Sequence, residues 1–113
     1  MKATIRTAGD VRIVDLDGKI TIGGGDVQLR QLIEESLGAG QNKLLLNLKG
    51  VSHVDSAGIG EMVGCYTTVT RRGGRMKLEN LPPKINDLLT VTQLITVFDV
   101  FDNEAEAVAS FSK

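Results

Sequence analysis

The residues of this chain best suited to chemistry stand together in the segment Asp55-Ser56-Ala57-Gly58-Ile59-Gly60. An aspartate or serine at a helix start accepts hydrogen bonds from the free N–H groups of the first turn, so one of this pair is expected to cap a helix. The small residues Ala57, Gly58 and Gly60 would leave backbone N–H groups open, and a helix start favours negative charge. We therefore predict that Ser56 can carry a phosphate, with Asp55, Ala57 and Gly58 supporting the site.

A catalytic serine is the first alternative for Ser56. The strained nucleophile turn of hydrolases needs a glycine two residues before the serine, and Val54 occupies that position here. The single histidine, His53, would have to reach Ser56 and be oriented by a third group. These requirements disfavour a hydrolase, and we expect a protein that is not an enzyme.

Three further segments have both a functional and a structural interpretation, and the structural one is favoured for each. The run Gly23-Gly24-Gly25 lacks the Gly-Lys-Ser/Thr end of a phosphate-binding loop, which indicates a flexible connection before a helix. Cys65 stands among apolar residues, as is typical of a small buried side chain. The basic residues around Arg72 and Arg75 are typical of a solvated edge.

Composition and charge disfavour several classes of function. Thirteen Lys+Arg against fourteen Asp+Glu give a formal net charge of −1, so no direct contact with nucleic acid is expected. One Cys and one His provide neither a disulfide nor a metal-ligand cluster, and no cofactor is expected. The N-terminus lacks a long apolar run, which predicts no membrane insertion and a cytoplasmic protein. A length of 113 residues predicts one domain over 1–113.

The elements that must position the 55–60 segment alternate between strands and helices. Strands are expected at 4–6, 11–16, 20–22, 43–48, 75–78 and 97–98. Helices are expected to be capped by Asp26 and end at Gly38, to continue from Ile59 through Thr70, to begin at Pro83, and to be capped by Asn103 with Glu106. This order predicts an α/β fold with about four helices, in which a largely parallel sheet lies behind an antiparallel N-terminal edge.

Two expectations concern the glycines of the second predicted helix. Gly60 and Gly64 are four residues apart and so share one helix face, which is expected to pack against the sheet or another helix. Gly58 is expected to keep the surface open, so that Gly58→Leu would weaken partner binding with little loss of fold.

In its context the 55–60 segment resembles the phosphorylation-site motif of the STAS domains of bacterial anti-sigma factor antagonists. It lies between the apolar strand at 44–48 and an amphipathic helix, as in that family. The segment Gly18-Lys19-Ile20-Thr21, the pair Gly73-Gly74 and the stretch 77–81 match further family features. At Thr21 the chain departs from the family, which often has an aspartate there. The resemblance covers essentially the whole chain and implies a STAS fold over 1–113.

The resemblance also implies a function in partner switching, the control of transcription by exchange of binding partners. The unphosphorylated protein would bind an anti-sigma factor that is also a serine kinase and thereby release a sigma factor. The kinase would phosphorylate Ser56 and end the complex, and a PP2C-like serine phosphatase would reset it. Since the kinase holds the ATP and magnesium, this chain would need no cofactor.

The expected partner surface combines the glycine loop, the end of the strand before the motif and the start of the helix after it. Its residues are Gly23, Gly24, Gly25, Ser52, His53, Ile59 and Gly60. One alternative is a STAS docking subunit of a transport or stress-signalling assembly, which would not be phosphorylated. Another is a weak nucleotide-binding domain or enzyme.

Overall fold

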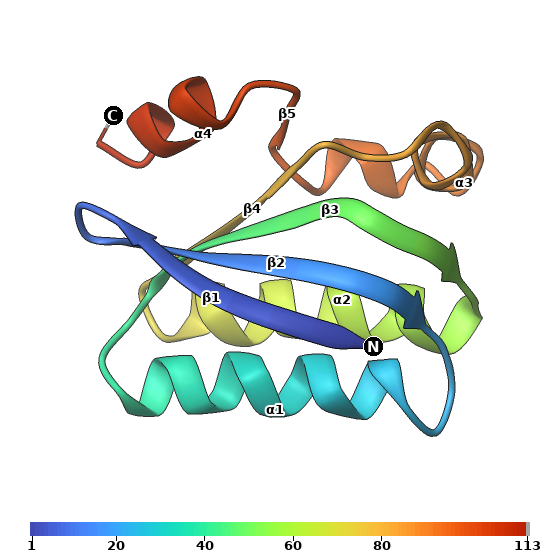
Figure 1. Ribbon diagram of the computed structural model, residues 1–113, viewed down its shortest axis with the longest axis horizontal. Helices are drawn as coiled ribbons and strands as arrows, with labels where there is room; N and C mark the ends of the chain where they lie inside the picture. Colours follow the sequence, from blue (N-terminus) through green and yellow to red (C-terminus); the bar gives the residue numbers. More distant parts are fainter. Residues whose placement is uncertain (113) are drawn as a thin grey trace.

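Five strands form one sheet whose spatial order follows the chain, β1-β2-β3-β4-β5, in the computed structural model, which describes residues 1–112. The strands are β1 (Lys2–Ala8), β2 (Val11–Ile20), β3 (Lys43–Val54), β4 (Arg75–Glu79) and β5 (Val100–Phe101). The helices are α1 (Gly25–Gly38), α2 (Ser56–Arg71), α3 (Pro83–Val91) and α4 (Glu104–Ser110), with a short 3-10 turn, η1 (Leu94–Thr96). Only β1 is antiparallel to its neighbour (Figure 1), so the predicted α/β architecture is confirmed.

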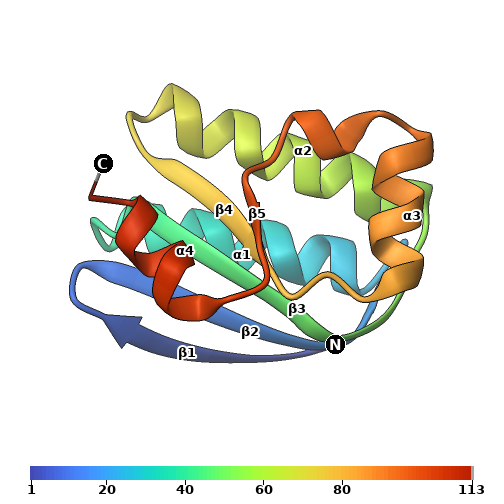
Figure 2. The same cartoon turned by 90° about the horizontal axis from the view of Figure 1, so that it is seen from above.

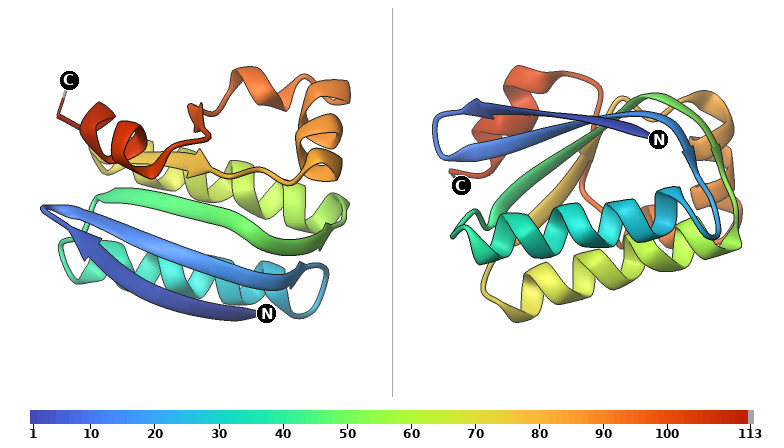
Figure 3. Two further views of the ribbon diagram at one scale, coloured as in Figure 1. Left: turned by 45° about the horizontal axis from the view of Figure 1, so that its top comes forward. Right: turned by 60° about the horizontal axis from the view of Figure 1, so that its bottom comes forward.

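The helices cover the two faces of the sheet unequally. α1 and α2 lie side by side on one face and α4 lies on the other, while α3 stands near the end of β3 (Figures 2 and 3). Along β3, Leu44, Leu46 and Leu48 join the core beneath α1 and α2. Leu45 points the other way and packs with Phe111, the residue that follows α4. This alternation between two covered faces explains why the strand is almost continuously apolar.

Two strand predictions are wrong. Residues 18–20 belong to β2, which continues through Gly18 instead of turning there. Gly18 has φ +110°, and the pairing of β2 with β3 shifts register beside it, so the glycine bends the strand without ending it. The last strand lies at Val100–Phe101 rather than 97–98, because η1 precedes Val97 and Phe98 is drawn into the core.

The boundaries of α1 also differ from the prediction. The helix begins at Gly25, so Asp26 is not its cap. The Asp26 carboxylate instead accepts hydrogen bonds from the N–H groups of Gly24 (3.1 Å) and Val27 (2.8 Å). Gly38 is still helical, and the left-handed backbone that ends the helix appears at Gly40, with φ +81°. The glycine that ends the helix is therefore Gly40, two residues later than predicted.

The other helices agree with the sequence. α2 contains the expected stripe from 59 to 70, and Cys65 within it is buried, which raises the pKa of its thiol to about 12. Pro83 is the first residue of α3. Asn103 Oδ1 accepts a hydrogen bond from the Glu106 N–H at 3.0 Å, which confirms the predicted cap of α4.

Candidate functional site

The 55–60 segment lies at the carboxyl end of the parallel strands. Asp55 is the one residue between β3 and α2, so the motif begins where the strand becomes a helix. The loop 21–24 leaves the neighbouring strand β2 at the same end of the sheet and leads into α1. The starts of α1 and α2 therefore meet beside the ends of β2 and β3, where ligands and partners of parallel sheets commonly bind (Figure 1).

Asp55 ties these two connections together. Its Oδ1 accepts a hydrogen bond from the Gly58 N–H at 2.8 Å, which makes Asp55 the N-cap of α2. Its Oδ2 accepts a second bond, at 3.0 Å, from the N–H of Ile22 in the loop after β2. The bond from Ile22 and then that from Gly58 hold the pKa of the Asp55 carboxyl below its usual range. The side chain is thus an anion around neutral pH, and it fixes the 21–24 loop beside α2.

Gly25 and Gly58 allow close packing of backbone instead of keeping the partner surface open. Both are buried, and both helix starts press against the end of β2. A Cβ atom at Gly58 would lie 2.0 Å from the carbonyl oxygen of Ile20, and one at Gly25 would lie 2.0 Å from that of Lys19. Gly58 therefore permits close backbone packing, and the expectation that Gly58→Leu leaves the fold intact is wrong. Gly25, expected at the partner surface, is likewise buried and does not present exposed backbone there.

The prediction that Gly60 and Gly64 lie on a packed face of the helix is wrong. Both residues are exposed on α2. A Cβ atom at Gly60 would meet nothing within 4 Å, and one at Gly64 would meet only a Glu61 oxygen at 3.7 Å. Their shared face therefore does not pack against the sheet or another helix. Spacing alone showed that they lie on one face but not whether that face looks inward or outward.

Ser56 is the first residue of α2, and its side chain is exposed. Ala57 follows, half-buried. The acidic cap stands directly before Ser56, and the first turn of the helix has no acidic residue of its own. Ser56 thus combines access from solvent with the positive end of a 16-residue helix.

The other residues expected at the partner surface are distributed over the same end of the molecule. Gly23 is exposed and Gly24 half-buried in the loop held by Asp55. Ser52 and His53 are exposed near the end of β3, and the Ser52 hydroxyl donates a hydrogen bond to the Gly18 carbonyl at 3.2 Å. Ile59 is half-buried and packs against the core, so only part of it remains for a partner.

Two parts of this surface were missed at the level of sequence. Ile22 was assigned to a strand, but it lies in the loop after β2 with its side chain 76% exposed. In addition, α3 forms a pocket of about 220 Å³ against the end of β3, lined by Ser52, His53, Val54, Lys84, Ile85 and Leu88. Since α3 is 30 residues or so downstream, no local pattern could place it there.

His53 lines this α3 pocket, whereas Ser56 is not among its lining residues. In the described part of the chain, no group of three His, Cys, Asp or Glu side chains could hold a metal ion. Within residues 1–112, no helix is long and apolar enough to cross a membrane. What this end of the sheet offers is an exposed hydroxyl at Ser56, an exposed isoleucine at Ile22 and a carboxylate held by two backbone N–H groups.

Comparison with known proteins agrees with this architecture. The STAS domain family matches residues 2–107. The anti-sigma F factor antagonist of Paenibacillus polymyxa is 30% identical over 98 residues, which cover 86% of this chain and 83% of that protein. The anti-sigma-B factor antagonist of Bacillus subtilis is 33% identical over 87 residues, covering 77% of this chain and 78% of that protein.

Solved structures share the fold at lower identity. A crystal structure of a Thermotoga maritima protein superposes with a TM-score of 0.89 at 23% identity, covering 98% of this chain and 95% of that one. The Bacillus cell fate determinant SpoIIAA in its phosphorylated form gives a TM-score of 0.73 at 20% identity, covering 96% and 98%. With the family match, these likenesses show that the chain belongs to the STAS domain family, among the relatives of anti-sigma factor antagonists.

Proposed function

We propose that this protein is an anti-sigma factor antagonist whose binding to its partner is ended by phosphorylation of Ser56. The observation that carries the proposal is the position of Ser56, exposed at the first residue of α2 beside a loop that Asp55 holds in place. The two antagonists that are 30% and 33% identical to this chain support the class of function.

Two features of the geometry favour Ser56 over Ser52 as the residue to be modified. Ser52 is also exposed, but its hydroxyl already donates to the Gly18 carbonyl, and it stands within a strand. Ser56 stands at the positive end of a helix, where negative charge that develops on its oxygen is stabilised. A kinase would therefore find Ser56 both more accessible and better prepared.

The unmodified surface would bind its partner through apolar contact around the site. Ile22 presents a largely exposed side chain on the loop that Asp55 anchors, so the surface is formed before binding and little ordering is needed. Phosphorylation would add about −1.5 to −2 charges next to this contact. Since the ionised Asp55 is adjacent, the modified site would carry a concentration of negative charge that an apolar or acidic partner surface could not accommodate.

The partners in this scheme are an anti-sigma factor with serine kinase activity and a PP2C-like serine phosphatase. The chain itself would perform no catalysis and hold no cofactor. Transcription would be controlled in the cytoplasm by which partner is bound, since capture of the anti-sigma factor releases the sigma factor. The docking subunit without phosphorylation remains the alternative, and the following experiment separates the two.

The experiment combines site mapping with binding. After incubation with the cognate kinase and ATP, mass spectrometry should find phosphate on Ser56 in the wild type and in Ser52→Ala. Calorimetry with the kinase should show tight binding of Ser56→Ala and weaker binding of Ser56→Asp, which adds about one charge rather than nearly two. Ile22→Ser should also weaken binding, whereas Ile5→Ser, at an exposed isoleucine in the middle of β1, should not. Phosphate on Ser52, or wild-type affinity of Ser56→Asp, would refute the switch.

A further inference from the structure

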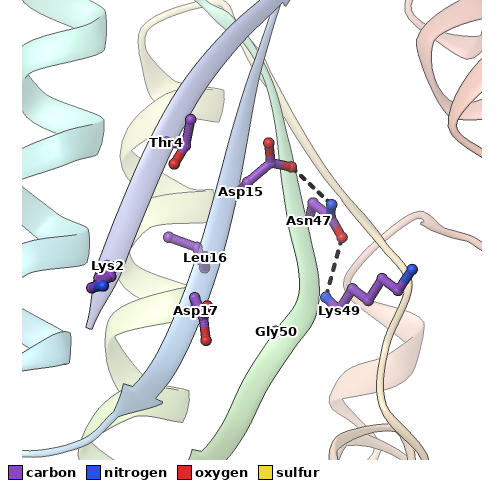
Figure 4. Close-up of a pocket in the computed structure, with 8 residues that line it drawn as sticks. All are labelled: Lys2, Thr4, Asp15, Leu16, Asp17, Asn47, Lys49 and Gly50. Atoms are coloured by element: carbon purple, nitrogen blue, oxygen red, sulfur yellow. Dashed lines mark hydrogen bonds between the residues drawn. The ribbon is translucent and has the colours of Figure 1, made fainter.

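A row of polar side chains runs across the strands on the face of the sheet that carries α4. Packing of the apolar core does not explain this row. The strand register places Thr4 opposite Asp15, Asp15 opposite Asn47, and Asn47 opposite Glu79. The open end of this row lines a surface pocket of about 490 Å³, where Thr4, Asp15 and Asn47 lie together (Figure 4). The closed end, at Glu79, lies under the start of α4.

A hydrogen-bonded network joins this row to α4. The Arg6 guanidinium donates to Asp15 Oδ1 at 2.9 Å and to Glu104 Oε1 of α4 at 2.7 Å. Asn47 donates to Asp15 at 2.8 Å and accepts from the Asn80 amide at 3.1 Å. Three strands, the residue that follows β4 and one helix are thus joined in one network that includes the Arg6 guanidinium.

Glu79 is the residue of this network whose carboxyl oxygens are not satisfied by hydrogen bonds from the other side chains. It is 0% exposed, and within residues 1–112 no N–H or hydroxyl group donates a hydrogen bond to its Oε2. Its Oε1 receives only a 3.4 Å contact from the Asn80 amide. The Glu104 carboxyl of α4 lies beside Glu79, where the two carboxyl groups can interact through a shared proton. Two carboxylates can share such a contact only if one of them holds a proton.

Two cations near Glu79, Arg6 and Lys77, are bound to other groups and do not neutralise its carboxylate in place of that proton. β1 supplies Arg6, which is already divided between two carboxylates, and β2 supplies one of these, Asp15. β3 and β5 place the uncharged Asn47 and Phe101 opposite Glu79. Lys77 lies on the same face of β4, but its ammonium donates to Ser110 at 2.9 Å. Burial, and then the contact with Glu104, raise the pKa of Glu79 to about 7, whereas Arg6 first of all lowers that of Glu104.

We propose that Glu79 and Glu104 form a proton-dependent latch, in which one proton shared by the two carboxyl groups holds the start of α4 against the sheet. When Glu79 loses this proton, two carboxylates face one another at a buried position and the attachment of α4 weakens. The latch lies on the face of the sheet opposite α2 and does not depend on phosphorylation of Ser56 (Figure 1).

The sign of the effect follows from the two protonation equilibria. The ordinary pKa of a glutamate, 4.5, applies when α4 is detached, and a value of about 7 applies when it is attached. The contribution of Glu79 to attachment is therefore complete below pH 4.5, is lost as the pH rises, and is absent well above 7. Glu104, whose pKa Arg6 lowers, acts in the opposite sense only below pH 4.5, so attachment should weaken with rising pH above that value. Between pH 5.5 and 7.5 the equilibrium constant for opening α4 should increase about 20-fold.

Two measurements on the intact protein test the latch. The first is the ¹³C chemical shift of the Glu79 side-chain carboxyl as a function of pH, which should titrate near pH 7 in the wild type. The second is amide hydrogen exchange of α4 in the regime where it reports the opening equilibrium, corrected for the intrinsic pH dependence of exchange. The predicted increase in opening should disappear in Glu79→Gln, whose amide stays neutral and can still donate to Glu104.

The matched control is Glu106→Gln, which removes an exposed carboxylate from the same helix and should keep the wild-type pH response. A Glu79 carboxyl that titrates below pH 5 would overturn the proposal without any variant. So would an increase in α4 opening with pH that is the same in Glu79→Gln as in the wild type, because another group would then be responsible.

Discussion

The starts of α2 and α4 are capped in the same way but attached to the sheet by different means. Asp55 and Asn103 each accept a hydrogen bond from the N–H group three residues ahead, at 2.8 and 3.0 Å. At α2 the helix backbone itself meets the strand, because Gly58 lets it approach the Ile20 carbonyl. At α4 the contact is made by side chains, through Glu104 with Arg6 and Glu79.

This difference affects how each helix start responds to its surroundings. Backbone packing does not titrate, and the Asp55 carboxylate is stabilised by two N–H donors, so the α2 start keeps its shape and charge around neutral pH. The α4 start depends on a buried carboxyl whose pKa is raised by its neighbours. One region is therefore suited to present a constant surface, and the other to change with conditions.

The largest expected effect comes from breaking the backbone contact at α2. Gly58→Val should lower the free energy of unfolding by about 3 kcal/mol, because the new side chain would overlap the Ile20 carbonyl and a strand end cannot shift freely. Urea denaturation at pH 7 measures the change. Gly60→Val is the matched control on the same helix, at an open position, and should change stability by less than about 1 kcal/mol. Equal unfolding curves for the two variants would contradict the close packing.

A smaller effect is expected from removing the carboxylate that caps α2 and holds the loop. Asp55→Ala should lower the melting temperature at pH 7 by roughly 5 °C, as for loss of a helix cap in a domain of this size. Because the pKa of Asp55 is lowered by folding, its stabilising effect is complete above the ordinary value of 3.8 and is lost as the pH falls through the folded value.

The pH dependence distinguishes charge from hydrogen bonding at this position. The difference in melting temperature between the wild type and Asp55→Asn should be largest near neutral pH. It should shrink only as the pH falls below the ordinary value of 3.8 and through the lower folded value, where the wild-type carboxyl takes up a proton. A difference that stays constant down to pH 2 would show that the charge of Asp55 does not contribute.

The smallest effect is a gain. Gly60→Ala should raise the free energy of unfolding by about 0.5–1 kcal/mol, since an exposed helical glycine is less favourable than alanine and the added methyl group meets nothing. Denaturant unfolding would detect the gain. If the same variant weakened partner binding, the partner would have to approach the backbone at Gly60 closely, which would locate the interface on this side of α2.

Sequence and structure agree where neighbouring residues carry the information. The uninterrupted apolar stretch of β3, the helical spacing of α2 and the cap at Asn103 were readable because each depends on residues two to four positions apart. The combination of Asp55 and Ser56 indicated a capped helix start with an exposed hydroxyl, and the structure has Asp55 as the cap and Ser56 exposed.

The tertiary structure decided what the local patterns left open. The second bond of Asp55 joins it to Ile22, 33 residues away, and Glu79 meets Glu104 from a separate element. Whether a glycine keeps a surface open, as at Gly60, or admits a strand carbonyl, as at Gly58, depends on which segment packs there. Periodicity and capping describe a helix by itself, whereas the distances between segments are set by the packing of the whole core, which brings together residues that no short stretch of sequence connects.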